Sequence, residues 1–140
     1  MDLDTGGTAG EANGDTFIGI ERVLGTAAFG DTIQGTLQAD QLRGLGGDDF
    51  LFGEAGDDII DGDAGNDTLD GGQGNDRLNG GAGSDLYYAD NAGDIVIELA
   101  GEGTDEVRTT LNSYVLAANV EDLIFTGSGN FSGSGNGLNN

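Results

Sequence analysis

Aspartate recurs at every ninth position across the middle of the chain. The series consists of Asp31, Asp40, Asp49, Asp58, Asp67, Asp76, Asp85 and Asp94. Carboxylate oxygens are hard ligands, and calcium takes about six to eight oxygen ligands in a flexible arrangement. The chain has no histidine and no cysteine, which are the usual ligands of zinc. The residue types therefore favour a site for a hard divalent cation.

Other residues keep the same nine-residue period between Gly44 and Tyr88. Each block there has glycine at the first and fourth places, aspartate at the sixth and an apolar residue at the eighth. The blocks read GLGGDDFLF, GEAGDDIID, GDAGNDTLD, GGQGNDRLN and GGAGSDLYY. A weaker form of the pattern extends over residues 26–43 and 89–97. An unbroken period of this kind indicates a repeat architecture.

Each block divides into a turn and a short strand. The first six places are rich in glycine and acids, as in turns with residues at positive φ. The last three are often β-prone, and side chains alternate along a strand, so the eighth place faces inward and the seventh and ninth outward. Two blocks form one coil of a parallel solenoid with 18 residues per coil. The sequence predicts an all-β fold with one column of apolar side chains from Ile33 to Val96.

Charge makes this solenoid dependent on a counter-ion. The formal net charge is −22, and stacking sets carboxylates such as those of Asp58 and Asp76 above one another. One large apolar side chain per block is a small core for a chain with 29 glycines. A cation bound between two turns removes the repulsion, and its binding free energy becomes folding free energy.

The blocks resemble the calcium-binding nonapeptide G-G-x-G-x-D-x-U-x of RTX proteins. GGQGNDRLN and GGAGSDLYY match it at every place. The resemblance implies a right-handed parallel β-roll, bound calcium, and a secreted bacterial parent protein that uses type I secretion. It implies a module that folds when it meets calcium outside the cell and supports the secretion and stability of a larger protein.

The resemblance also implies how each calcium is bound. The earlier of two turns gives carbonyls from places two and four and its aspartate, and the turn 18 residues later gives carbonyls from places one and three and its aspartate. Carried over to this chain, four sites are formed by Thr36, Gln38 and Asp40 with Gly53, Ala55 and Asp58; by Leu45, Gly47 and Asp49 with Gly62, Ala64 and Asp67; by Glu54, Gly56 and Asp58 with Gly71, Gln73 and Asp76; and by Asp63, Gly65 and Asp67 with Gly80, Ala82 and Asp85.

Two marginal sites pair Asp31 with Asp49 and Asp76 with Asp94. Their outer turns depart from the pattern, because Phe29 and Ala92 stand at the fourth place where glycine is expected. Together these pairings predict about four to six calcium ions.

The flanks divide the chain into three parts. We predict an N-terminal loop and capping strand over residues 1–25, the calcium-binding β-roll over 26–97, and a β-rich linking segment over 98–140 that leads towards a further repeat. The capping strand is expected from the apolar residues Phe17, Ile18, Ile20, Val23 and Leu24. We expect the chain to be a piece of a longer protein.

Composition excludes several other functions. Four arginines and no lysine make binding to nucleic acid or to an anionic membrane surface improbable. Without histidine or lysine, a serine nucleophile lacks its usual activating base. The acids outside the period, among them Glu98, Glu102 and Asp122, form no evident cluster in the sequence. The sequence therefore predicts a module that is not an enzyme.

An alternative function is that of an accessory module that binds a polysaccharide or another surface, as in alginate epimerases and adhesins. The outward places hold apolar side chains, which are Phe50, Phe52, Ile59, Leu86 and Tyr88. They are explained either by packing under a flanking segment or by docking of a ligand or a neighbouring domain.

Overall fold

The computed structural model describes residues 13–16, 22–138 and 140, and all of the regular elements in these residues are β-strands. The strands are β1 (Asn13–Thr16), β2 (Arg22–Leu24), β3 (Thr32–Gln34), β4 (Gln41–Arg43), β5 (Phe50–Phe52), β6 (Ile59–Ala64), β7 (Thr68–Asp70), β8 (Arg77–Ala82), β9 (Leu86–Tyr88), β10 (Ile95–Ile97), β11 (Glu106–Thr109), β12 (Ser113–Val115), β13 (Asp122–Phe125) and β14 (Ser132–Ser134). The predicted all-β class is confirmed.

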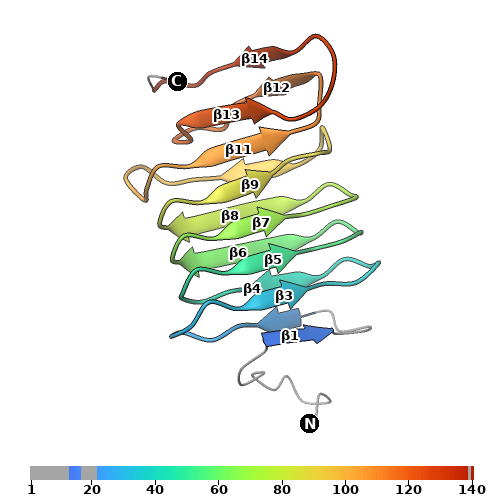
Figure 1. The fold of residues 1–140 in the computed structure, drawn as a ribbon, viewed down its shortest axis with the longest axis vertical. Coiled ribbons are helices and arrows are strands. Elements are labelled where there is room, and N and C mark those ends of the chain that lie inside the picture. The colour runs from blue at the N-terminus through green and yellow to red at the C-terminus, as the bar shows by residue number, and fades with distance from the viewer. Residues whose placement is uncertain (1–12, 17–21, 139) are drawn as a thin grey trace.

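The strands form two facing stacks, and every described pairing is parallel. One sheet has seven strands in the order β1-β3-β5-β7-β9-β11-β13, and the other has five in the order β10-β8-β6-β4-β2. A separate two-stranded sheet joins β12 to β14. Successive strands of the chain alternate between the two main sheets, so the chain winds upward as a solenoid (Figure 1).

The register of the strands confirms the predicted coil length. Ile60 pairs with Leu42 on one side and with Leu78 on the other, and the hydrogen bond from Asp49 N–H to the Asp67 carboxylate spans the same 18 residues. The register changes after β9, where the contact between Asp85 and Asp105 spans 20 residues. The turn over residues 98–105 is therefore two residues longer than the six-residue turn of a regular block.

The core is a single column of side chains between the two sheets. In most three-residue strands of the roll the middle residue is buried and its neighbours are exposed or half-buried, as in β3 and β5. The column predicted from Ile33 to Val96 is confirmed, and Val23 and Val107 extend it; its members are Val23, Ile33, Leu42, Leu51, Ile60, Leu69, Leu78, Tyr87, Val96 and Val107. Of the predicted capping segment, Phe17, Ile18 and Ile20 lie outside the described residues.

The turns require glycine at the fourth place for two reasons. There the backbone has a positive φ, for example +107° at Gly47 and +149° at Gly74. A Cβ atom at Gly47 would also overlap the backbone of Phe29 and Gly30 in the preceding coil. A side chain at this place therefore meets backbone strain and a steric clash at once.

We expect Gly47→Ala to destabilise the folded chain by at least about 2 kcal/mol, since it adds strain at positive φ to a collision with the backbone. The adjacent Gly46→Ala is the matched control, because a Cβ there would lie 3.2 Å from the Ala27 carbonyl and needs only a small adjustment. Urea denaturation of both variants in one buffer measures the difference. Equal loss of stability in the two variants would contradict this account of the turns.

Candidate metal centre

The sixth-place aspartates form two series, one along each stack of turns, and we call the two series together the ladder. The backbone N–H of each aspartate donates to Oδ1 of the aspartate 18 residues later, with N···O distances from 2.6 to 3.1 Å. The pairs are Asp31–Asp49, Asp40–Asp58, Asp49–Asp67, Asp58–Asp76, Asp67–Asp85 and Asp76–Asp94. These are the six pairs that the sequence predicts as neighbours.

The other carboxylate oxygen, Oδ2, has no hydrogen-bond partner in five buried aspartates of the described chain. They are Asp49, Asp58, Asp67, Asp76 and Asp85. A Cβ atom on Gly44 would collide with Oδ2 of Asp49 and would also lie 2.9 Å from the carbonyl oxygen of Gly62. Both oxygens thus face the space beside the first-place glycine. A buried space lined by acceptors needs a cation or a hydrogen-bond donor, and carboxylate and carbonyl oxygens together are a ligand set that fits a metal ion.

The same arrangement repeats along the roll. Oδ2 of Asp58 and the carbonyl of Gly71 face Gly53, and Oδ2 of Asp67 and the carbonyl of Gly80 face Gly62. In each case the two oxygens belong to the two turns that one predicted site combines. The first-place glycine is needed here because any side chain would fill this space.

Backbone hydrogen bonds join the turns of each predicted site through their other carbonyls. The Thr36 carbonyl accepts from Ala55 N–H at 3.1 Å, and the Glu54 carbonyl accepts from Gln73 N–H at 2.9 Å. Three third-place carbonyls are also occupied: Ala64 accepts from Gly47, Gln73 from Gly56 and Ala82 from Gly65. Because a carbonyl has two lone pairs, these bonds leave each oxygen with one lone pair for a ligand.

The remaining second- and fourth-place residues adopt the backbone geometry of the turns. Leu45, Glu54 and Asp63 have positive φ at the second place, as do Gly56 and Gly65 at the fourth. A Cβ atom at Gly56 would overlap the backbone of Gln38, so these two fourth-place residues also lie against each other.

The outermost aspartates differ from the central ones. Oδ2 of Asp31 accepts from Thr26 N–H, and Oδ2 of Asp40 accepts from the N–H and hydroxyl of Thr36. At the other end, Oδ2 of Asp94 accepts from Asn91 N–H at 2.9 Å. Protein donors therefore already occupy these three carboxylates, whereas the central five lack a partner for Oδ2.

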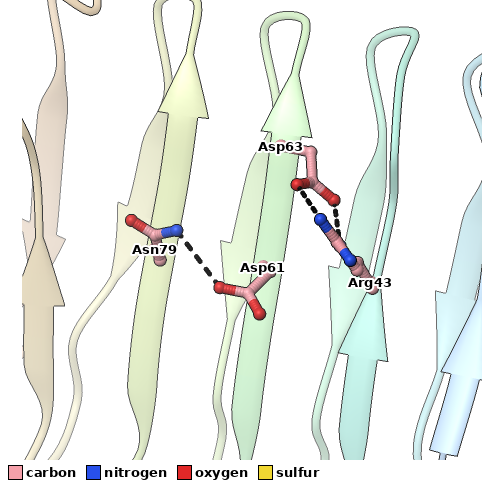
Figure 2. A network of polar contacts seen from close by, with 4 residues as sticks. All are labelled: Arg43, Asp61, Asp63 and Asn79. Carbon is pink, nitrogen blue, oxygen red and sulfur yellow. Dashed lines mark hydrogen bonds and ion pairs between the residues drawn. The ribbon is translucent and has the colours of Figure 1, made fainter.

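The outward side chains make a second set of polar contacts on the surface of the five-stranded sheet. Arg43 forms a two-pronged ion pair with Asp63, at 2.5 and 2.6 Å, and Asn79 donates to Asp61 at 3.1 Å (Figure 2). The side chain of Asp63 thus points outward, and only its backbone carbonyl is available to the predicted site. These exposed contacts contribute little to stability.

Burial changes the acidity of the ladder. It raises the pKa of Asp49, Asp58, Asp67 and Asp76 to about 6 and that of Asp85 to about 7. The donated backbone N–H partly offsets this effect, and neighbouring carboxylates raise the pKa further. Holding these groups ionised without a cation therefore costs free energy.

Sequence reasoning missed two acidic residues that the fold brings to the ladder. Asp105 accepts from Asp85 N–H at 2.8 Å and continues the ladder. The expectation that Glu98 belongs to no cluster is wrong, because its carboxylate lies with those of Asp85 and Asp105. The two extra residues shift Asp105 out of phase with the nine-residue period, so counting by nines does not find it. The signal that could have found it is the buried Val107 two places later, which is the spacing of every regular block.

Fold and ladder together define a parallel β-solenoid whose turns stack carboxylates in the manner of a cation-binding repeat. The sequence profile described as "RTX calcium-binding nonapeptide repeat (4 copies)" matches residues 26–60, 53–87 and 61–96. The chain belongs to this family, and its repeats are a calcium-binding module.

Comparison with solved structures gives a similarity to the AlgE6R3 subunit from the Azotobacter vinelandii mannuronan C5-epimerase, a solution structure. The identity is 29% and the TM-score 0.26, over 65% of this chain and 52% of that chain. The chain therefore spans about half the length of that structure. The comparison with curated proteins gives no match. No helix in the described residues is long and apolar enough to cross a membrane.

We expect the calcium-free chain to be more stable in mild acid than at neutral pH. The folded-state pKa of four ladder aspartates, about 6, exceeds the value of about 3.9 in an unfolded chain. The contribution of these aspartates to the free energy of unfolding is therefore fully present below about pH 4 and is lost as the pH rises through about 6 to 7.

The β-structure of calcium-stripped protein, followed by circular dichroism at about pH 5 and about pH 7.5, measures this effect, and we expect more of it at the lower pH. Saturating calcium should reverse the order, because protons compete with the metal for the same oxygens. Greater stability of the stripped protein at the higher pH would contradict the assignment.

Proposed function

We propose that residues 26–97 bind calcium ions between successive turns and that this binding drives the folding of the module. The observation that carries the proposal is the set of five buried carboxylate oxygens without a hydrogen-bond partner. Three of them, in Asp49, Asp58 and Asp67, are held beside a carbonyl oxygen of the next coil, and the described ion pairs lie on the outer surface, away from all five. A cation at these positions satisfies both oxygens and cancels the repulsion along the ladder.

The ligands of the four central sites are the two aspartates of each predicted pair and the four carbonyls from the same two turns. Because one carboxylate oxygen faces the preceding turn and the other faces the following one, Asp58 serves the site with Asp40 and the site with Asp76. With the marginal pairs included, the module takes about four to six calcium ions. Calcium is favoured over magnesium because backbone carbonyls and carboxylates at these turns form an irregular oxygen shell.

Folding is coupled to export in this proposal. Extracellular calcium modules bind with dissociation constants of about 10⁻⁴ to 10⁻³ M. In the calcium-poor interior of a cell such a module stays unfolded and passes through a type I secretion system. Outside, calcium folds it, and the folded roll supports the stability of its larger parent protein. Membership of the RTX family supports this part of the proposal.

The partners beyond calcium stay predictions. Binding of a polysaccharide or a neighbouring domain has in its favour only outward apolar side chains such as Phe50 and Ile59, which are 50% and 41% exposed. The absence of catalysis by this chain likewise stays a prediction from its residue composition.

Calcium titration tests the coupling of binding to folding. In excess chelator we expect a circular-dichroism spectrum without β-structure, and we expect β-structure to appear with a midpoint of about 10⁻⁴ to 10⁻³ M free calcium at neutral pH. Magnesium at the same concentration is the control and should leave the spectrum of the calcium-free chain unchanged. A β-rich spectrum in chelator that calcium does not alter would refute the proposal.

Replacement of a single shared ligand tests the site assignment. Asp58→Asn should raise the midpoint calcium concentration at least about tenfold, or about 1.4 kcal/mol, because it removes a negative ligand from two adjoining sites. Asp57→Asn is the matched control: it makes the same change of charge at the neighbouring residue, which is exposed and outside the ladder. Equal midpoints for the two variants would show that the ladder carboxylate is not a ligand.

A further inference from the structure

Three acidic side chains meet where the regular period of the roll ends. Asp85 precedes β9, Glu98 follows β10 and Asp105 precedes β11. One carboxylate oxygen from each lies within 4.8 Å of the other two. Their exposed fractions are 2%, 6% and 2%, so the group is buried. We call Asp85, Glu98 and Asp105 the junction cluster.

Hydrogen bonds fix the junction cluster but leave two of its oxygens without a partner. The hydroxyl of Tyr87 accepts from Gly80 N–H at 2.7 Å and donates to Oε1 of Glu98. Oδ1 of Asp105 accepts from Asp85 N–H at 2.8 Å. Oδ2 of Asp85 and Oε2 of Glu98 have no partner in the described protein. Two orphaned oxygens in a buried acidic group point to a missing positive charge.

The described protein does not supply that charge. Its two ion pairs, Arg43 with Asp63 and Arg108 with Glu106, lie outside the junction cluster. Burial, together with the neighbouring acids, raises the pKa of both Asp85 and Glu98 to about 7. Keeping all three carboxylates ionised at this point therefore costs free energy, and the described protein supplies no cation to offset that cost.

The junction cluster differs in kind from a nonapeptide site. Glu98 stands at the first place of its block, where the blocks from Gly44 to Tyr88 all have glycine. It adds its carboxylate to those of Asp85 and Asp105, whereas a regular turn places a carbonyl oxygen beside the aspartate Oδ2. The two aspartates also lie 20 residues apart rather than 18. The extra length of the turn therefore accommodates the added side chain.

We propose that the junction cluster is a separate divalent-cation site, selective for calcium, that fastens the last regular coil to the C-terminal segment. Oxygens on opposite sides of a calcium ion lie about 4.6–5.2 Å apart, which matches the span of the cluster. Since three carboxylates surround it, the site fills at a lower calcium concentration than the nonapeptide turns. The proposal goes beyond calcium binding by the repeats, because Glu98 and Asp105 lie outside them.

Native mass spectrometry of the full chain during titration with calcium chloride tests the proposal. Glu98→Gln preserves the shape of the side chain and removes one charge. This variant should take up one ion fewer at saturation, and it should lack the binding step that the unmodified chain shows at the lowest calcium concentration. Glu102→Gln is the matched control, because it makes the same change on the same connection outside the cluster. It should bind the same number of ions as the unmodified chain.

Each outcome decides the proposal. Equal ion counts in Glu98→Gln and Glu102→Gln would overturn it and would mean that protons neutralise the cluster. If Glu98→Gln does not fold in calcium, Glu98→Gly restores the residue of the regular blocks and should fold with one ion fewer. If neither variant folds, Glu98 has only a structural role, and the proposed cation site is overturned.

The same titration separates this proposal from the function proposed for the repeats. If the nonapeptide turns bound no calcium, the unmodified chain would take up only the junction ion, and Glu98→Gln would remove it. If only the junction site is wrong, the unmodified chain and both variants bind the same several ions.

Discussion

Repulsion between stacked carboxylates is the constraint on which the rest of this structure depends. Coils of a parallel roll lie about 4.8 Å apart, and two unit charges at about 4 Å repel by about 4 kcal/mol at an effective dielectric constant of about 20. Each inner aspartate of the ladder has such a neighbour above and below. The apolar column contributes one buried side chain per block, which is little against a repulsion that recurs at every step. The fold therefore needs positive charge placed between its turns.

The backbone conformation of the turns leaves space for such a charge. First-place glycine leaves open the space that Oδ2 and a carbonyl share, and fourth-place glycine allows one turn to lie directly on the next. Positive φ at the second and fourth places lets the backbone reverse direction tightly within each turn. Leu45, Glu54 and Asp63 adopt this conformation at the second place without being glycine. The same turn geometry is thus kept even where the sequence makes it costly.

The regular part of the molecule could be predicted almost completely from the sequence. A fixed period of nine determines which aspartates are neighbours, and Asp58 lies between Asp40 and Asp76 as the period requires. The alternation of strand side chains likewise predicts that Leu51 is buried and Phe50 exposed. Such predictions succeed because each coil contacts only the next one, so local spacing determines tertiary contacts.

The junction escaped prediction for the same reason. Two inserted residues shift the register, and counting by nines then pairs Asp85 with Gly103 rather than with Asp105. The contact of Glu98 with Tyr87 depends on a hydroxyl at a place that otherwise holds leucine, isoleucine or valine. Nothing in the repeat pattern anticipates a polar pair inside the apolar column. Only the folded structure shows that the break in the nine-residue period brings the acids of the junction cluster together.

Sharing of carboxylates makes the turns interdependent. An aspartate that presents one oxygen to the preceding turn and the other to the following one belongs to two gaps. Asp67 does so, because its Oδ1 accepts from Asp49 N–H and its Oδ2 faces the same space as the carbonyl of Gly80. If each gap binds a calcium ion as we propose, filling one gap orders a ligand for the next, and neighbouring ions assist one another through the side chain they share. In a solenoid with nearest-neighbour contacts, this is the route by which order spreads along the chain. On this proposal the chain folds from any filled gap outward, and the extent of order follows the supply of cations.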